Sequence, residues 1–196
     1  MINSKEDLKE YLRLDAIMLG RPANRPRFWH DEMWTYQILM RKCEYYINCR
    51  RDFLGKIWLK FLKFRFTRIG RIRGFQLPFN VFGPGLAIAH YGSIVVNANS
   101  RIGKNCRIHE NTTIGANGFY SNKAPIIGNN VYIATGARII GDITIADDVV
   151  IGANAVVVKS ILEPGTTWAG VPAKKISNKS SEDYLVKGVE SGVIMK

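Results

Sequence analysis

Every sixth residue is aliphatic in IGNNVYIATGARIIGDITIADDVVIGANAVV, residues 127–157. The same period occurs earlier in the chain, and a small or β-branched residue stands four positions after each aliphatic one. The aliphatic positions are Val96, Ile102, Ile108, Ile114, Ile127, Ile133, Ile139, Ile145, Ile151 and Val157. A strand repeats every two residues and an α-helix every 3.6 or so, about half the observed spacing. Six residues instead suit one flat side of a coil, so the pattern predicts a solenoid of stacked coils with the aliphatic residues inside.

The repeat is interrupted once, between Ile114 and Ile127, which are 13 residues apart. A spacing of 12 would keep the six-residue register, so one extra residue is expected to bulge within 115–126. Asn117-Gly118 and Ser121-Asn122 are the local turn formers there. A loop at such a break is where a solenoid tends to place specificity.

The full chain of 196 residues carries a formal charge of +12, and most of this positive charge lies in its first part. Residues 1–78 hold 17 Lys+Arg against 8 Asp+Glu, a net +9, while residues 79–196 hold 11 against 8, a net +3. The basic character therefore belongs to an N-terminal extension. We expect a basic α-helical extension over residues 1–80, the solenoid over 81–176 and a polar tail over 177–196.

Composition also predicts a compartment. No apolar run approaches the roughly 18 residues that a membrane-spanning helix needs. The start of the chain, MINSKEDLKE, is too charged for a signal peptide. Both observations predict a cytoplasmic protein. Cys43, Cys49 and Cys106 lack metal-ligand or secretory spacing, so we expect reduced thiols.

Two helices are expected before residue 50. Ser4 is a suitable N-cap for a helix that ends near Leu19, because Asp7 stands three residues after it. Gly20-Arg21-Pro22 then stops that helix. A second helix is expected from Phe28 to Cys49, with many aromatic residues available for burial.

The segment Arg50–Arg73 combines nine Lys+Arg and a single acid with many large apolar residues. On a helix, one apolar stripe would have three lysines beside it. The stripe is Leu54, Ile57, Trp58, Phe61 and Leu62, and the lysines are Lys56, Lys60 and Lys63. Such a helix suits an anionic membrane surface. The same stripe would also suit a cover for the open first coil, whose strand edge must be hidden, and the two roles are compatible. Nucleic-acid binding is not expected, because no recognised motif accompanies the charge.

Two motifs flank the repeat. Gly83-Pro84-Gly85-Leu86-Ala87-Ile88-Ala89-His90 precedes it, and Ala169-Gly170-Val171-Pro172-Ala173-Lys174 follows it. Together with the repeat, they resemble the hexapeptide-repeat acyltransferases, and most of all their serine acetyltransferase branch. The resemblance implies a mainly β fold, a left-handed parallel β-helix, in a homotrimer with active sites between neighbouring prisms. It also implies transfer of an acetyl group from acetyl-CoA to a hydroxyl, with no metal expected.

The resemblance makes His90 the catalytic base, because His90 follows the Gly-Pro-Gly stretch at the start of the β-helix. An imidazole can deprotonate an alcohol near neutral pH, and direct attack on the thioester then needs no covalent enzyme intermediate. His109 is the second candidate. It stands at a corner 19 residues after His90, close to one coil of about 18 residues, so the two could meet on adjacent coils. The other interpretation of His109 is an exposed corner side chain, and His30, outside the repeat, is expected to be structural.

Several features depart from the serine acetyltransferase pattern. Ala89 stands where an acid usually precedes the catalytic histidine, and Glu110 is a candidate to orient His90 in its place. Lys123-Ala124-Pro125 stands where the family uses an Arg-His pair before a proline to receive the carboxylate of serine. One cation survives there, which makes Lys123 and Asn117 the candidate acceptor contacts. The helical N-terminal part is also shorter than in the family.

The donor side matches better. By the resemblance, the CoA arm lies along consecutive coils and its phosphates lie near cations that follow the Gly-Val-Pro turn. The matching positions are Ala134, Gly152 and Ala153, with Lys159, Lys174 and Lys175 as the basic residues. Trp168 suits either contact with the adenine or a plug at the end of the prism. Cys106 occupies a small inward-facing position, and we do not expect it to be a nucleophile.

The acceptor has two candidates. The branch resemblance favours L-serine, whereas the segment 50–73 favours a sugar hydroxyl of a surface polysaccharide or its lipid-linked precursor. A membrane-held substrate would place the enzyme at the inner face of the membrane. Two other functional classes agree less well with the sequence. A zinc hydro-lyase of the γ-carbonic anhydrase kind needs three histidines on one metal, and the repeat supplies only His90 and His109. An inactive trimeric scaffold is disfavoured by His90 and the intact Gly-Val-Pro turn.

Overall fold

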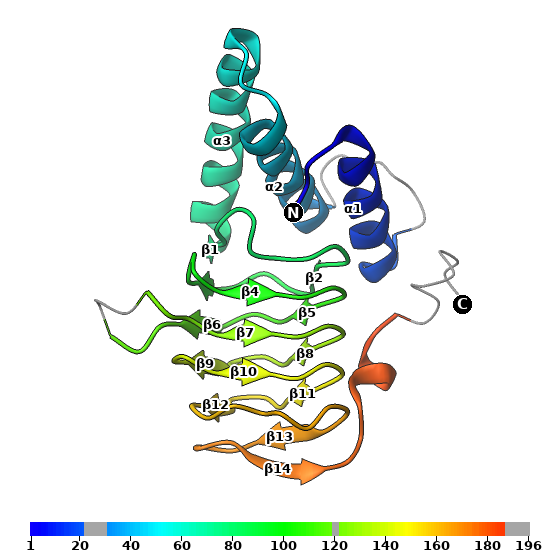
Figure 1. Ribbon diagram of the computed structural model, residues 1–196, viewed down its shortest axis with the longest axis vertical. Coiled ribbons are helices and arrows are strands. Elements are labelled where there is room, and N and C mark those ends of the chain that lie inside the picture. The colour runs from blue at the N-terminus through cyan, green and yellow to red at the C-terminus, as the bar shows by residue number, and fades with distance from the viewer. Residues whose placement is uncertain (22–30, 119–121, 187–196) are drawn as a thin grey trace.

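The computed structural model describes residues 1–21, 31–118 and 122–186. Three helices lie at one end of a tall stack of coils, and the chain winds down the stack to its last strands at the other end (Figure 1). The helices are α1 (Lys5–Met18), α2 (Glu32–Cys49) and α3 (Phe53–Arg73). His30 and the expected start of the second helix at Phe28 lie outside the described residues. Within the described residues, no helix combines the length and the hydropathy needed to cross a bilayer.

Side-chain caps explain where two of these helices begin. The Ser4 hydroxyl accepts a hydrogen bond from the Asp7 N–H at 2.9 Å, as predicted for α1. Asp52 caps α3 by accepting from the Gly55 N–H at 3.0 Å. α3 ends at Gly74, whose φ of 77° is a left-handed conformation that glycine adopts at little cost.

The strands form three sheets, one on each face of a three-sided prism. The first sheet contains β1 (Phe75–Gln76), β3 (Ile94–Val96), β6 (Thr112–Gly115), β9 (Arg138–Ile140) and β12 (Val156–Val157). The second contains β4 (Arg101–Ile102), β7 (Ile126–Ile127) and β10 (Thr144–Ile145). The third contains β2 (Ala87–Ile88), β5 (Arg107–Ile108), β8 (Tyr132–Ile133), β11 (Val150–Ile151), β13 (Thr167–Ala169) and β14 (Lys174–Ser177). The pairings among these strands are parallel except that of β13 with β14.

The aliphatic ladder fills the prism as the repeat predicts. Ile108, Ile133 and Ile151 have no exposed surface and pair in register on successive coils. Burial of one such side chain contributes about 1.5–3 kcal/mol, so a column of them strongly favours stacking of the coils. Asparagine occupies several of the corners between strands, where Asn105 and Asn130 have positive φ values of 56° and 55°. The Asn105 side-chain amide donates to the Asn130 side-chain oxygen at 2.8 Å, which joins two coils.

The break in the repeat is larger than the one residue predicted. β6 and β7 lie on consecutive faces, the first and second sheets, so Ile114 and Ile127 are successive rungs. Their 13-residue spacing therefore contains seven extra residues instead of one. A gap of 13 residues can contain one further rung and one extra residue, or no further rung and seven extra residues. Sequence spacing alone does not distinguish these two arrangements, because they differ only in how the strands pair. The described residues of the β6–β7 connection, 116–118 and 122–125, extend away from the prism (Figure 1).

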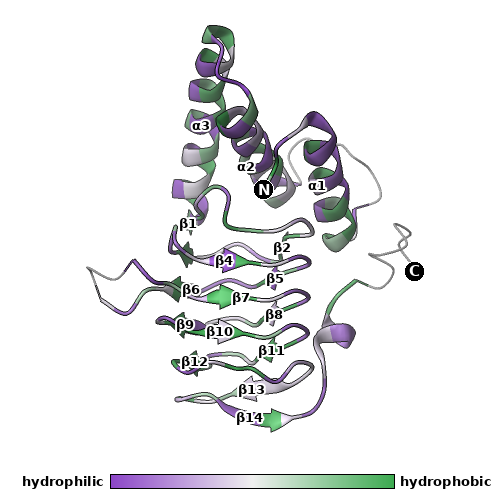
Figure 2. Cartoon of the chain, viewed as in Figure 1, coloured by the Kyte–Doolittle hydropathy of each residue, from purple (hydrophilic) through white to green (hydrophobic). Residues whose placement is uncertain are grey.

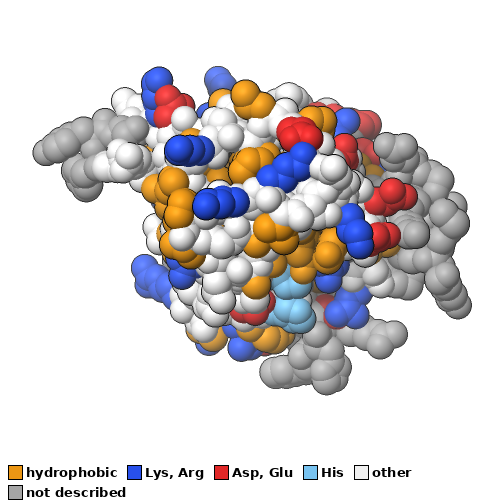
Figure 3. Space-filling model, turned by 90° about the horizontal axis from the view of Figure 1, so that it is seen from below, with side chains coloured by type: hydrophobic (Ala, Val, Ile, Leu, Met, Phe, Trp, Pro, Cys, Tyr) orange, Lys and Arg blue, Asp and Glu red, His pale blue; other side chains and the backbone are white. Residues whose placement is uncertain are grey.

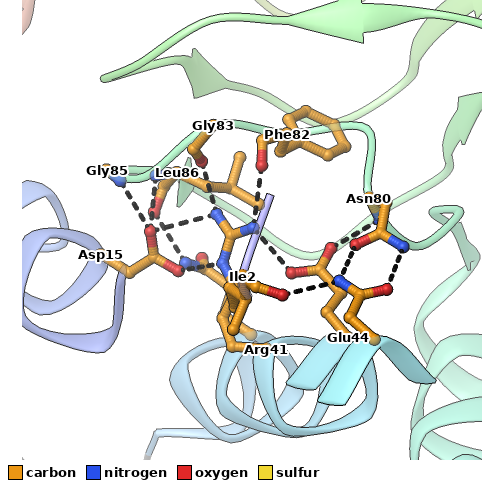
Figure 4. Close-up of polar contacts among 11 residues, drawn as sticks. Ile2, Asp15, Arg41, Glu44, Asn80, Phe82, Gly83, Gly85 and Leu86 are labelled. Atoms are coloured by element: carbon orange, nitrogen blue, oxygen red, sulfur yellow. Dashed lines mark hydrogen bonds and ion pairs between the residues drawn. The ribbon is translucent and has the colours of Figure 1, made fainter. Parts of the chain in front are cut away.

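A buried arginine joins the helices to the first coil. Arg41 of α2 has no exposed surface and binds Asp15 of α1 at 2.8 Å and Glu44 at 3.1 Å. Its guanidinium also donates to the carbonyl oxygens of Phe82 and Gly83, at 3.0 and 2.6 Å. These contacts connect α1, α2 and the loop that precedes β2 (Figure 4). Helix and strand packing near the first coil therefore depends on one cation.

α3 does not cover the first coil with the stripe predicted from the sequence. Of that stripe, Leu62 is buried, whereas Leu54 is 72% and Ile57 51% exposed. The buried face of α3 instead centres on Leu62 and Phe66, because α3 packs sideways against α2 and β1. Phe66 stacks on Tyr36 of α2 with 4.4 Å between the ring centroids. The cover of the first coil is thus shared with α2, and most of the stripe faces outward.

Candidate active site

Two histidines meet at the edge of the prism where the chain leaves the third sheet for the first. His90 follows β2, and His109 follows β5. Because β2 pairs with β5 in register, the two turns stack, and the ring centroids lie 5.3 Å apart. The prediction that these histidines approach each other on adjacent coils is confirmed. Histidine side chains lie beside an acidic side chain in the view from below (Figure 3).

Glu110 completes the group. Ile88 pairs with Ile108, so the residue 20 positions after His90 stacks beneath it, and that residue is Glu110. Ligand-type atoms of His90, His109 and Glu110 lie within 4.8 Å of one another. The His109 Nδ1 atom is 3.9 Å from the Glu110 Oε2 atom. A carboxylate on the next coil thus lies within 4.8 Å of a His90 ring nitrogen, although Ala89 supplies none from its own coil.

Burial and charge set the ionisation of this group. Hydrogen bonding with the Thr135 side chain is the main cause of the lowered pKa of Glu110, so Glu110 is a carboxylate near neutral pH. Burial, with a smaller contribution from Arg107, lowers the pKa of His109. Near neutral pH His109 is therefore neutral and can accept or donate a single ring proton. Among the described residues, the buried His109 Nε2 and Glu110 Oε2 atoms have no hydrogen-bond partner, so both can serve a ligand.

Tyrosines continue the row of rings and were not predicted. Tyr132 lies edge-on to His109 with 5.1 Å between centroids, and Tyr184 lies 4.7 Å from Tyr132. Tyr184 belongs to a short 3₁₀ helix, Ser181–Tyr184, in the segment expected to be a polar tail. Tyr132 precedes the rung Ile133, so its outward direction could be inferred from the repeat, whereas the return of Tyr184 to this edge could not.

The positions predicted for CoA continue down the same edge. The residues that follow β5, β8 and β11 of the third sheet each donate an N–H to a carbonyl one coil below. The bonds are His109 to Ile133 at 3.0 Å, Ala134 to Ile151 at 2.9 Å and Gly152 to Trp168 at 2.8 Å. Ala153 follows Gly152 at this corner. A Cβ atom on Gly152 would lie 2.9 Å from the Ala169 Cβ atom, so glycine allows the coils to approach here.

The predicted basic residues lie near the far end of the prism. Lys174 and Lys175 lie in β14, the last strand of the third sheet, and Lys159 follows β12. The Lys175 Nζ atom is 2.6 Å from Glu163 Oε1, so this cation already has a carboxylate partner. Five strand spacings of about 4.8 Å separate β2 from β14, so roughly 24 Å of edge is available to an extended ligand.

Two other residues singled out in the sequence have structural surroundings. The Trp168 indole N–H donates to the Thr166 hydroxyl at 3.0 Å, and the Trp168 ring packs against the core. These contacts favour a role for Trp168 in closing the end of the prism over contact with the adenine. Burial raises the pKa of Cys106 to about 12. A thiol that is protonated at neutral pH is a poor nucleophile, in agreement with the expectation from the sequence.

The predicted acceptor residues lie on another edge of the same chain. Asn117 and Lys123 belong to the β6–β7 connection, between the first and second sheets, whereas His90 lies between the third and the first. The Lys123 Nζ atom is 2.7 Å from Asp142 Oδ2. One chain therefore does not bring its own acceptor residues to its own histidines.

The histidine group also has a possible metal-ligand set. His90, His109 and Glu110 each offer one ligand atom, and two imidazoles with one carboxylate suit zinc. This set differs from the three histidines that the sequence analysis required for a zinc hydro-lyase.

Comparison with known proteins agrees with the fold. Residues 124–159 match the family described as bacterial transferase hexapeptide (six repeats). A serine acetyltransferase of Helicobacter pylori strain J99 is 39% identical over 108 residues, which cover 54% of this chain and 63% of that protein. The chain thus spans less than two thirds of that relative.

Solved structures extend the likeness to the helices. The serine acetyltransferase of Brucella abortus has a TM-score of 0.70 at 24% identity, over 90% of this chain and 71% of that one. The same enzyme in complex with coenzyme A has a TM-score of 0.61 at 22% identity, over 89% and 68%. These findings confirm the resemblance to hexapeptide-repeat acyltransferases of the serine acetyltransferase type, and the left-handed parallel β-helix.

Proposed function

We propose that this hexapeptide-repeat protein transfers an acetyl group from acetyl-CoA to a hydroxyl, with residues 81–176 as its acyltransferase domain. The observation that carries the proposal is the approach of His90 and Glu110 at one edge, above a column of corner positions that leads to Lys174. The similar proteins named serine acetyltransferase, one of them in complex with coenzyme A, support this chemistry.

In the proposed reaction, His90 accepts the proton of the acceptor hydroxyl as its oxygen attacks the thioester carbonyl. The carbon–sulfur bond then breaks, and the protonated imidazole returns the proton to the CoA sulfur. Glu110 orients the His90 ring and stabilises its positive charge, the role that a carboxylate at position 89 would otherwise fill. Hydrogen bonds of this kind are often long without substrate, so separations of up to 4.8 Å in the group are compatible with the role.

A homotrimer would complete the site. Asn117 and Lys123 lie on a different edge from His90 within one chain, so a site that uses all three needs a neighbouring copy. A three-sided prism with equivalent edges suits a closed threefold ring. In that arrangement the β6–β7 connection of one copy would contact the acceptor held near His90 of the next.

The acceptor is L-serine in our first version of the proposal, because the similar proteins are named for serine. A sugar hydroxyl is the alternative. Lys123 has a carboxylate partner in Asp142, and the family's Arg-His pair is missing, so the carboxylate of serine has fewer cations to bind. We place the enzyme in the cytoplasm, where acetyl-CoA is made, and at the inner membrane face if the acceptor is lipid-linked.

The decisive experiment follows loss of the acetyl-CoA thioester with serine and with a panel of sugars. Thioester absorbance is preferable to a thiol reagent, because Cys49 is partly exposed and would react. His90→Asn should lower transfer by roughly 100-fold or more and leave the oligomer mass unchanged. Lys179→Ala, an exposed lysine outside the site, is the matched control. An unchanged rate in His90→Asn would refute the assignment of the base.

The metal-ligand set supports a second candidate, a zinc hydro-lyase. Stoichiometric zinc in the purified protein, lost in both His109→Asn and Glu110→Gln, would favour it. Zinc-independent transfer would favour the acetyltransferase.

A further inference from the structure

α3 carries an outward apolar surface that the described part of the protein does not cover. Phe53 is 76%, Phe64 65% and Trp58 48% exposed. We call this surface the apolar face of α3, and it consists of Phe53, Leu54, Ile57, Trp58, Phe61, Phe64 and Ile72. Leu62 and Phe66 occupy the opposite side, against α2 and the first coil. The helix is therefore apolar on both sides, and core packing accounts for only one of them.

The position of α3 makes this face accessible. The joint between α2 and α3 is the part of the chain furthest from the prism, and α3 descends from it to the first coil (Figure 1). Apolar and polar residues alternate around the whole length of the helix (Figure 2). The candidate active site lies on the prism below, so α3 can contact a flat surface without blocking His90.

Cations surround the apolar face. Arg50–Arg73 contains nine Lys+Arg and one acid, a net +8. The acid, Asp52, caps the helix and binds Arg50 at 2.7 Å, so it offsets little of the remaining charge. A hollow on the same helix has four cations around two apolar side chains, and its residues include Lys60, Lys63, Arg68, Arg71, Phe64 and Ile72. This combination suits a phosphate group attached to a hydrocarbon.

We propose that α3 docks on an anionic lipid bilayer, with its apolar face at the boundary of headgroups and acyl chains and its lysines and arginines on the headgroup phosphates. Charge selects this partner, because a purely apolar contact with a second copy would bring together two copies of residues 50–73, each of net +8. Aromatic and aliphatic residues beside lysines are the usual composition of a helix that lies in the bilayer interface. The inference does not depend on the acetyltransferase proposal.

The test is sedimentation of the full chain with vesicles of phosphatidylcholine, with and without about one third phosphatidylglycerol. We expect at least roughly tenfold stronger partition onto the anionic vesicles, and a loss of that binding as salt rises. Trp58 fluorescence should shift to the blue on binding, and Trp58→Phe should remove the shift. Equal partition onto both vesicle types would overturn the proposal.

Two variants separate the contributions, and one matched variant controls for them. Ile57→Asp should abolish insertion, and combined Lys56→Gln, Lys60→Gln and Lys63→Gln should reduce anionic selectivity at least roughly tenfold. Leu162→Ser with Lys179→Gln removes an exposed apolar residue and a cation from the other end of the chain, and should bind as the wild type does. Each side chain is exposed, so circular dichroism should show unchanged folding. If Ile57→Asp lowered the oligomer mass and left vesicle binding intact, the face would be an interface between copies and the proposal would be wrong.

Discussion

Replacement of Arg41 by alanine should be among the most destabilising single changes in the helical part of the chain. The substitution leaves the Asp15 and Glu44 carboxylates buried without their cation, and it frees the carbonyl oxygens of Phe82 and Gly83. Loss of one partner of a buried ion pair costs about 3–5 kcal/mol. For a chain of this size each kcal/mol lowers Tm by about 2–4 °C, so we expect a decrease of about 6–20 °C.

The chain offers a matched control for this prediction. Arg13 binds Glu10 at 2.7 Å, a distance like that of Arg41 to Asp15, but the two side chains are 43% and 51% exposed. An exposed ion pair contributes about 0.2–1 kcal/mol, so Arg13→Ala should lower Tm by no more than about 4 °C. Urea unfolding at a fixed protein concentration measures both costs, provided that the denaturant slopes agree. Equal costs for the two substitutions would show that burial of the Arg41 group contributes nothing, and would refute the reasoning.

Three further predictions concern the candidate site. Glu110→Gln should lower kcat by at least roughly tenfold and change KM for acetyl-CoA little, because the substitution removes the carboxylate proposed to orient His90 and alters none of the proposed CoA contacts; an unchanged kcat would contradict that role. Since the folded pKa of His109 lies below its unfolded value near 6.5, the unfolded chain binds more protons, and stability should fall as pH decreases below about 6.5. His109→Gln should weaken that dependence in thermal melts between about pH 5 and 7, and an unaltered slope would contradict the assignment. Lys174→Ala combined with Lys175→Ala should raise KM for acetyl-CoA more than KM for the acceptor, whereas an effect on the acceptor alone would exclude contact with CoA.

The candidate site was partly accessible from the sequence. His90 and His109 were predicted as neighbours because a period of six residues implies coils of about 18, and their separation of 19 nearly matches it. Glu110 was named as a possible partner of His90, but only the register of β2 with β5 places it on the adjacent coil. The sequence does not predict the position of Tyr184 beside Tyr132, because Tyr184 lies in a segment that has no repeat.

Residue counts along the chain predict the wrong size for the insertion in the repeat, because the sequence does not show which strands pair. The 13-residue spacing after Ile114 predicts one added residue, whereas strand pairing shows seven. The stripe on α3 was identified correctly as apolar, yet its direction depends on how α3 packs against α2 and β1. A helical projection reports which residues share a side, but not which side another element covers.

The sequence by itself determined the solenoid, its three faces and the edge on which the histidines stack, because a six-residue period acts through local geometry and is repeated ten times along the chain. Only the tertiary structure decided the length of the β6–β7 insertion, the burial of Arg41 between two acids and the outward direction of the apolar face of α3. These features depend on contacts between residues far apart in the chain, and a local sequence period does not predict such contacts. The same reason separates the acceptor residues from His90, since the position of an edge follows from strand pairing and not from sequence distance.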